Sequence, residues 1–118
     1  MDMASSLVIA IVAILHVYFL ILEMFLWTKP LGLKVFRQTL ESAEVTKVLA
    51  ANQGLYNGFL AAGLLWGLTL GEHGYDIKVF FLSCVVVAGV YGAATASRAI
   101  LFIQALPAAI GLALLLFV

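Results

Sequence analysis

Charge is scarce in this sequence: six Lys or Arg and six Asp or Glu stand among 118 residues, and the formal net charge is zero. Charged residues make up 10% of the chain, hydrophobic residues make up 65%, and the mean hydropathy is +1.19. So little polar surface cannot cover a soluble domain, which predicts an integral membrane protein surrounded by a lipid bilayer. The absence of a basic block gives no reason to expect a nucleic-acid partner.

Cysteine is nearly absent as well. The single Cys84, which we interpret as a small core residue, excludes an internal disulfide and a cysteine metal cluster, and we expect no cofactor. Met1 and Asp2 lack the basic residues that open a signal peptide, and no cleavage pattern follows the first apolar stretch. We therefore expect a retained spanning helix in a single domain, residues 1–118, because no linker or internal repeat interrupts the chain.

Four apolar stretches are long enough to cross a bilayer, and they predict an all-α bundle of four transmembrane helices. The expected helices cover residues 4–27, 48–70, 77–96 and 99–118. Small residues around Gly89 and Gly92 predict close contact between helices, and Pro107 predicts a kink that leaves the carbonyl of Ile103 exposed. The more polar segment 33–47 fits either a short helix lying in the interface or an extension of the second helix, capped by Thr39 or Ser42.

The distribution of Lys and Arg predicts the orientation. One side would carry Lys29, Lys34, Arg37, Lys47 and Arg98, whereas the other would carry Lys78 alone. Because basic residues concentrate on the cytoplasmic side, both termini are expected outside, with the segment 28–47 in the cytoplasm.

The second helix is interrupted by a polar run, Asn52-Gln53-Gly54-Leu55-Tyr56-Asn57-Gly58. Side-chain amides in hydrocarbon need hydrogen-bond partners, so this run predicts a protein-lined interior. Counting along each span places polar residues of four helices on one level, about 6–10 Å below the cytoplasmic interface. That layer holds Glu23, Asn52, Gln53, Tyr91 and Gln104, with His16, Tyr56 and Asn57 deeper.

Glu23 carries the charge of the predicted layer, because an ionised carboxylate in a spanning helix is costly unless it is paired, hydrated or protonated. His16 lies two turns away on the same helical face, so both side chains could border one cavity. Arg98, which shares an arc with Tyr91 and Thr95, is expected to turn inward and neutralise Glu23. The alternative is that Arg98 contacts phosphate headgroups.

These residues predict a cytoplasm-facing polar pocket that binds or conducts a small solute or a proton, in a protein that is expected to be a homo-oligomer. A second interpretation is a membrane enzyme for a lipophilic substrate, with Glu23 or His16 as general acid or base. A third is an accessory subunit whose polar residues only fix helix packing. The predicted binding residues are His16, Glu23, Asn52, Gln53, Tyr56, Asn57, Tyr91, Thr95, Arg98 and Gln104.

Segments in all four expected helices resemble a bacterial membrane-protein family known as domain of unknown function thirteen hundred and four. The resemblance rests on residues 16–19, 23–27, 52–63, 91–95 and 104–108. It implies four helices and a multi-pass protein of the bacterial inner (plasma) membrane, and it transfers no catalytic role. A weaker likeness links the chain to the small membrane-associated enzymes of eicosanoid and glutathione metabolism, but their helix-two carboxylate is missing here.

Overall fold

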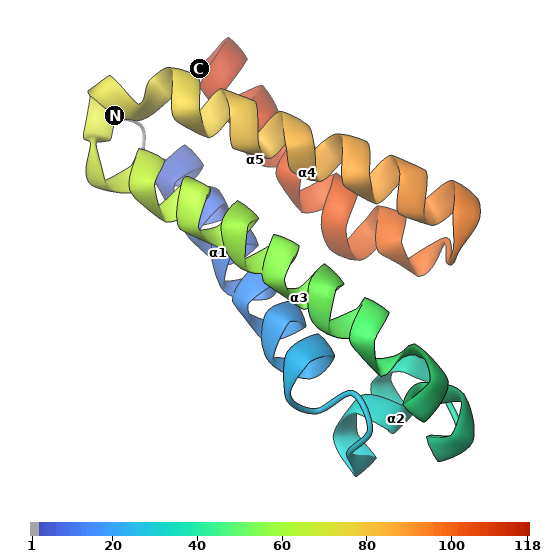
Figure 1. Ribbon diagram of the computed structural model, residues 1–118. Coiled ribbons are helices and arrows are strands. Elements are labelled where there is room, and N and C mark those ends of the chain that lie inside the picture. The colour runs from blue at the N-terminus through green and yellow to red at the C-terminus, as the bar shows by residue number, and fades with distance from the viewer. Residues whose placement is uncertain (1–2) are drawn as a thin grey trace. The chain divides into compact units, whose positions relative to one another are not determined.

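The computed structural model describes residues 3–118, and all of its regular elements in that range are helical (Figure 1). The α-helices are α1 (Met3–Met24), α2 (Pro30–Phe36), α3 (Leu40–Thr69), α4 (Tyr75–Thr95) and α5 (Leu106–Phe117). A 3-10 turn, η1 (Gly71–Gly74), precedes α4, and a π-helical turn, η2 (Leu101–Ala105), precedes α5. The predicted all-α class is therefore confirmed.

The number of spanning helices is confirmed only in part. Two helical stretches within residues 3–118 have the length and composition to cross a membrane, Met3–Met24 and Gly71–Thr95. The apolar stretch Leu101–Phe117 is shorter, and α3, although 30 residues long, does not qualify. The polar run at residues 52–57 lowers the mean hydropathy of α3. For this reason α3 has the length of a membrane span but not its composition.

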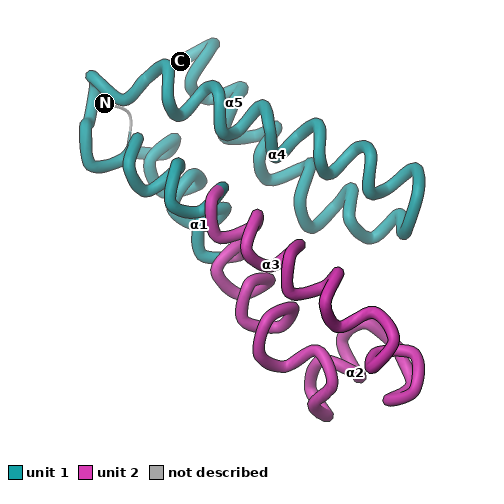
Figure 2. Tube along the Cα trace, in the orientation of Figure 1, with its two compact units in different colours: residues 1–14, 60–118 teal, residues 15–59 magenta. Residues whose placement is uncertain are grey.

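The chain divides into two compact units, and α1 and α3 each contribute to both (Figure 2). Unit 1 consists of Met1–Ile14 and Leu60–Val118, and unit 2 consists of Leu15–Phe59. The core of unit 1 is formed by fully or almost fully buried apolar residues, namely Ile9, Val12, Ala13, Leu64, Leu82, Val85 and Ala108. Apolar side chains at helical spacing on several helices thus give unit 1 a core of its own.

Within unit 1, α4 packs closely against η2. A Cβ atom added to Gly89 would lie 2.6 Å from the backbone nitrogen of Ala105, and one added to Gly92 would lie 3.1 Å from the side chain of Ile100. The predicted small-residue surface of the third helix is therefore confirmed. Glycine at these positions lets two backbones approach more closely than any larger residue would permit.

The bend expected near Pro107 takes the form of the π-helical turn. The N–H group of Leu106 donates to the carbonyl of Leu101, five residues earlier, and Pro107 stands in the first turn of α5. Proline is well tolerated there, because amides of a first turn have no partner within their own helix. Residues 99–117 are helical without a break, so the expected fourth helix, 99–118, is present and contains the π-helical turn before α5.

Lys78 differs most from its sequence interpretation. Its side chain is fully buried in unit 1, and Nζ donates a hydrogen bond of 3.0 Å to the carbonyl oxygen of Gly71. A Cβ atom on Gly67 would lie 2.6 Å from Lys78 Cγ, so the lysine stem packs against that glycine. Lys78 was expected as the one basic residue of the outer side, and that side stays a prediction. Its burial was not foreseen, and it is possible because η1 presents a carbonyl that accepts from its ammonium group.

Unit 2 holds the last part of α1, all of α2 and the first two-thirds of α3. Helix α1 ends at Met24 and not at residue 27, and Pro30 starts α2, where a missing N–H costs nothing. The backbone N–H of Ser42 donates to Thr39 Oγ1 at 3.1 Å, which caps the start of α3. The predicted extension of the second helix with its Thr39 cap is confirmed, and the short helix before it covers residues 30–36 and not 33–47.

Aromatic and glycine contacts fix the turn between α1 and α2 in unit 2. Trp27 Nε1 donates to Thr46 Oγ1 at 3.2 Å, and the Trp27 ring lies 4.8 Å from the ring of Phe36. Gly32 is buried, and a Cβ atom there would fall 1.9 Å from the carbonyl oxygen of Leu26. Trp27 is thereby held by α3 on one side and by α2 on the other.

Candidate functional site

Glu23 and Asn57 form a hydrogen bond between α1 and α3 inside unit 2. Asn57 Nδ2 donates to Glu23 Oε1 at 2.5 Å, and Asn57 is 6% exposed. Gly54 makes this pairing feasible, since a Cβ atom there would lie only 3.1 Å from Glu23 Cβ and 3.2 Å from the carbonyl oxygen of Leu20. The close approach of the helix backbones at Gly54 brings the amide of Asn57 within reach of the carboxylate one turn later.

An open cleft of about 380 Å³ lies beside this pair, also within unit 2. Its lining combines polar groups with apolar walls and consists of Glu23, Met24, Phe25, Trp27, Thr28, Lys47, Val48, Ala51 and Asn52. The second carboxylate oxygen, Glu23 Oε2, has no hydrogen bond to another residue of the described chain, 3–118. The cleft thus offers a carboxylate oxygen that is held in place through its neighbour but is free to accept.

Two other polar groups of the cleft make hydrogen bonds within α3. Asn52 Nδ2 donates to the carbonyl of Val48 at 3.2 Å, which leaves its Oδ1 as an acceptor. Lys47 Nζ lies 3.0 Å from Glu44 Oε2, so its charge is compensated on the surface of α3. The cleft therefore presents acceptor oxygens of Glu23, Asn52 and Thr28, together with the ammonium group of Lys47, which is partly engaged by Glu44.

Three more of the predicted site residues belong to unit 2 but do not line the cleft. His16 is fully buried and meets Phe19 edge to face at 5.4 Å, and it is not among the residues that line this cleft. Gln53 and Tyr56 are exposed on α3. Asn57 is buried and faces α1, as Gly54 does.

The remaining four predicted residues belong to unit 1. Tyr91 is 71% exposed, Thr95 Oγ1 donates to the carbonyl of Tyr91 at 2.8 Å, and Arg98 is exposed in the turn after α4. Gln104 is half-buried in η2. The polar layer and the pair between Arg98 and Glu23 would join residues of both units, and they stay predictions.

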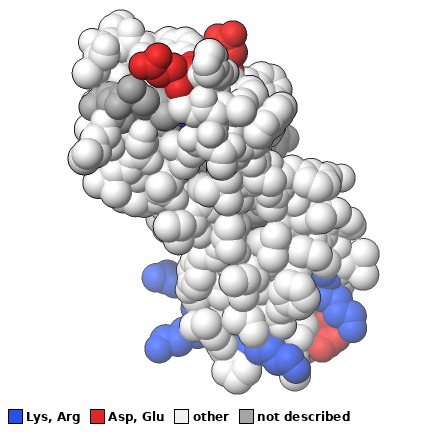
Figure 3. Space-filling view, turned by 90° about the vertical axis from the view of Figure 1, so that its left-hand side faces the viewer, with Lys and Arg blue, Asp and Glu red and all other residues white. Residues whose placement is uncertain are grey.

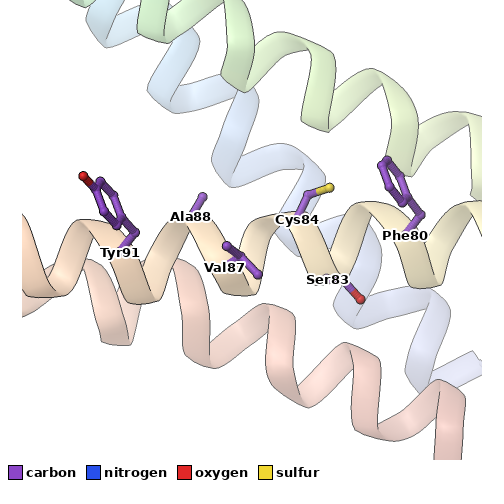
Figure 4. A pocket seen from close by; sticks show the side chains of 6 residues that line it. All are labelled: Phe80, Ser83, Cys84, Val87, Ala88 and Tyr91. Carbon is purple, nitrogen blue, oxygen red and sulfur yellow. The ribbon is translucent and has the colours of Figure 1, made fainter.

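A second groove, of about 480 Å³, runs along α4 in unit 1. All of its lining residues project from that single helix, as Figure 4 shows: Phe80, Ser83, Cys84, Val87, Ala88 and Tyr91. The hydroxyl of Ser83 donates to the carbonyl of Val79 at 2.7 Å, within the same helix. Cys84 is half-buried and lies outside the buried core of unit 1, so its prediction as a core residue is not confirmed. The groove brings no polar groups of different elements together.

Trp27, Thr28 and Lys47 line the cleft but were not among the predicted site residues. Basic side chains gather at the end of unit 2 that carries α2, which Figure 3 shows in blue. The signal that could have found the three residues is the position of Glu23, which lies only one turn from Trp27. Because Glu23 lies at the end of α1, the residues that directly follow the helix lie close to its carboxylate.

Comparisons with known proteins give a family and no activity. A family model described as "Protein of unknown function (DUF1304)" matches residues 10–116. An "Uncharacterized protein YpaA" of Lactococcus lactis subsp. lactis (strain IL1403) is 27% identical over 106 residues, which cover 88% of this chain and 89% of the relative. No solved structure matches.

The family description corrects what the resemblance implied. Its words state neither a bacterial membrane protein nor four helices, so those features cannot be taken from the family. Within residues 3–118, two helices have the length and composition required to cross a membrane. The matched region covers most of the sequence, and the chain therefore belongs to the family described as "Protein of unknown function (DUF1304)".

Proposed function

We propose that this chain is a multi-pass membrane protein in which the cleft of unit 2 opens to the cytoplasm and binds a small solute at Glu23. The observation that carries the proposal is the hydrogen bond between Asn57 and Glu23, which positions a carboxylate beside a cleft. A carboxylate in an apolar helix is costly, and such residues usually mark a binding or conduction site. A role in helix packing alone would need no open cleft at the carboxylate.

Four membrane spans are the arrangement that we favour, with α3 and the stretch from η2 through α5 added to the two apolar helices. The 30 residues of α3 correspond to about 45 Å of helix, longer than the roughly 30 Å hydrocarbon core. Its polar run can be accommodated because Asn57 faces α1, while Asn52 bonds to its own helix. Packing between copies in a homo-oligomer would cover the exposed Gln53 and Tyr56.

The orientation gives a direct prediction. In a Cys84→Ala background, a cysteine at Glu41 should be protected from an impermeant maleimide added outside intact cells, whereas one at His73 should react. Both positions are exposed in the structure. The basic residues near α2 are the physical reason, because they favour the cytoplasmic side. Reaction at Glu41 alone would reverse the orientation and with it the cytoplasmic opening of the cleft.

The proposed solute site is tested by Glu23→Ala. In purified protein, a panel of small cationic, anionic and neutral solutes should include at least one that raises the melting temperature of the wild type by a few degrees, as binding to the native state requires. Glu23→Ala should abolish that increase, and Glu41→Ala, a control that removes an exposed carboxylate outside the cleft, should retain it. Identical responses of wild type and Glu23→Ala to every solute would refute the assigned site.

A further inference from the structure

We propose that the cleft of unit 2 selects a small protonated amine, whose ammonium group binds Glu23 Oε2 while its hydrocarbon part lies against the apolar wall. This inference rests on the proposed function and names the class of solute. Its basis is the pairing of Glu23 Oε1 with Asn57, which leaves the other oxygen for a ligand. A cation that donates several hydrogen bonds is the natural partner of such an oxygen.

The oxygen atoms of the cleft favour a ligand that donates hydrogen bonds. Beside Glu23, the lining offers the carbonyl oxygen of Asn52, whose Nδ2 is engaged at Val48, and the hydroxyl of Thr28. The only cationic side chain of the lining, Lys47, is 3.0 Å from Glu44. An ammonium group has three donors and no acceptor, so up to three oxygens of the cleft can satisfy it. A carboxylate ligand would find a repelling charge at Glu23 instead.

The size and the walls of the cleft argue against a bare metal ion. A volume of about 380 Å³ is within the range of small-molecule sites and far exceeds what one ion fills. Met24, Phe25 and Val48 supply apolar surface, and Trp27 adds an indole ring to the lining. An aromatic ring also attracts an organic cation through its π face. A short alkylammonium ion matches both features of the cleft, the carboxylate and the apolar wall.

Two sources could supply this chemistry: a free alkylamine from the cytoplasm or the ethanolamine headgroup of a phospholipid. The lining includes Trp27 and Thr28, directly after α1, where a headgroup would be found if α1 crosses the bilayer. Both ligands present a primary ammonium group to Glu23. They differ in whether the apolar part stays in the membrane, and the experiment separates them.

The test uses the full chain in a maltoside detergent that contains no lipid, with Trp66→Phe as background so that Trp27 is the only tryptophan. The probes are butylammonium chloride, butanol, sodium butyrate and sodium chloride, and the readout is Trp27 emission. We expect saturable change with butylammonium, at least about tenfold weaker binding in Glu23→Gln, and unchanged binding in the control Glu41→Gln. Thr28→Val, which keeps Glu23, should weaken binding severalfold, so the test does not depend on one variant.

Each outcome decides between the alternatives. Nanodiscs of phosphatidylethanolamine that weaken butylammonium binding, relative to phosphatidylcholine, which is also zwitterionic but has no primary ammonium group, identify the headgroup as ligand. Equal binding in both identifies the free amine. Butanol or sodium ions that bind as well as butylammonium overturn the amine class, and so does unchanged binding in Glu23→Gln. If butyrate or butanol binds in a Glu23-dependent way instead, the proposed solute site stands and only its amine selectivity fails.

Discussion

Asn57→Leu is expected to destabilise the purified protein by about 1–3 kcal/mol, the usual range when one partner of a buried hydrogen bond is removed. Leucine keeps the branch of asparagine at Cγ but is larger and cannot donate to Glu23, so the carboxylate would stay at the contact of α1 and α3 without its partner. Asn52→Leu is the matched control, because Asn52 is exposed and bonds to Val48 in its own helix. It should change the free energy of unfolding by less than about 0.5 kcal/mol.

A double-mutant cycle isolates the interaction itself. Glu23→Leu and Asn57→Leu are measured alone and together by reversible unfolding in mixed micelles, and the double variant should be more stable than the two single effects predict, by at least about 1 kcal/mol. The physical reason is that Glu23→Leu removes the group that Asn57→Leu would leave unpaired. Additive effects, within a few tenths of a kcal/mol, would mean that the two side chains do not interact in solution.

Gly32→Ala is expected to have the second large effect on stability. The substitution disturbs the contact between α2 and the turn after α1, which holds Trp27 in the cleft lining. The new methyl group would lie 1.9 Å from the carbonyl oxygen of Leu26 and 3.1 Å from Trp27 Cα, both backbone atoms that no rotamer change can move. We expect α2 to shift away from the turn after α1, a loss of about 1–3 kcal/mol in stability, and a changed emission of Trp27. Trp66→Phe again serves as background for the fluorescence measurement.

Lys34→Ala is the control on the same helix. Lys34 is exposed on α2, and alanine suits a helix, so the free energy of unfolding should stay within about 0.5 kcal/mol of the wild-type value. If Gly32→Ala is as stable as Lys34→Ala and leaves Trp27 emission unchanged, α2 does not pack against the turn in the way described. The position of Trp27 in the cleft would then lose its basis.

The sequence was informative where a residue has one dominant physical requirement. Small residues in the third helix predicted the contact at Gly89, and one of the two predictions for the segment before the second apolar stretch had a cap at Thr39 or Ser42, of which the structure shows Thr39. Glu23 was predicted as a site residue because a carboxylate in an apolar helix needs a polar partner. In the structure Asn57 donates a hydrogen bond to it. The all-α class followed from long apolar stretches alone.

Residues that can satisfy their hydrogen bonds or their packing in several ways were predicted less well. Lys78 could have reached water, but the carbonyl of Gly71 accepts from it in the interior of unit 1. His16 shares a helical face with Glu23, yet it is buried and its ring meets Phe19. Residues on one helical face can have different neighbours, so a shared face does not place two side chains in one site. The π-helical turn before α5 could not be foreseen either, because Pro107 is compatible with a kink, a break or a changed hydrogen-bond register.

The most direct test of the solute site is an experimental structure of the protein in a lipid nanodisc with butylammonium present, at a resolution that shows individual side chains. We expect density within hydrogen-bond distance of Glu23 Oε2, at about 2.7–3.0 Å, while Asn57 Nδ2 stays on Oε1. The density should extend toward Met24 and Val48 and should be absent in Glu23→Gln. A cleft closed by side chains around Glu23, with no room for a ligand, would contradict the proposed site.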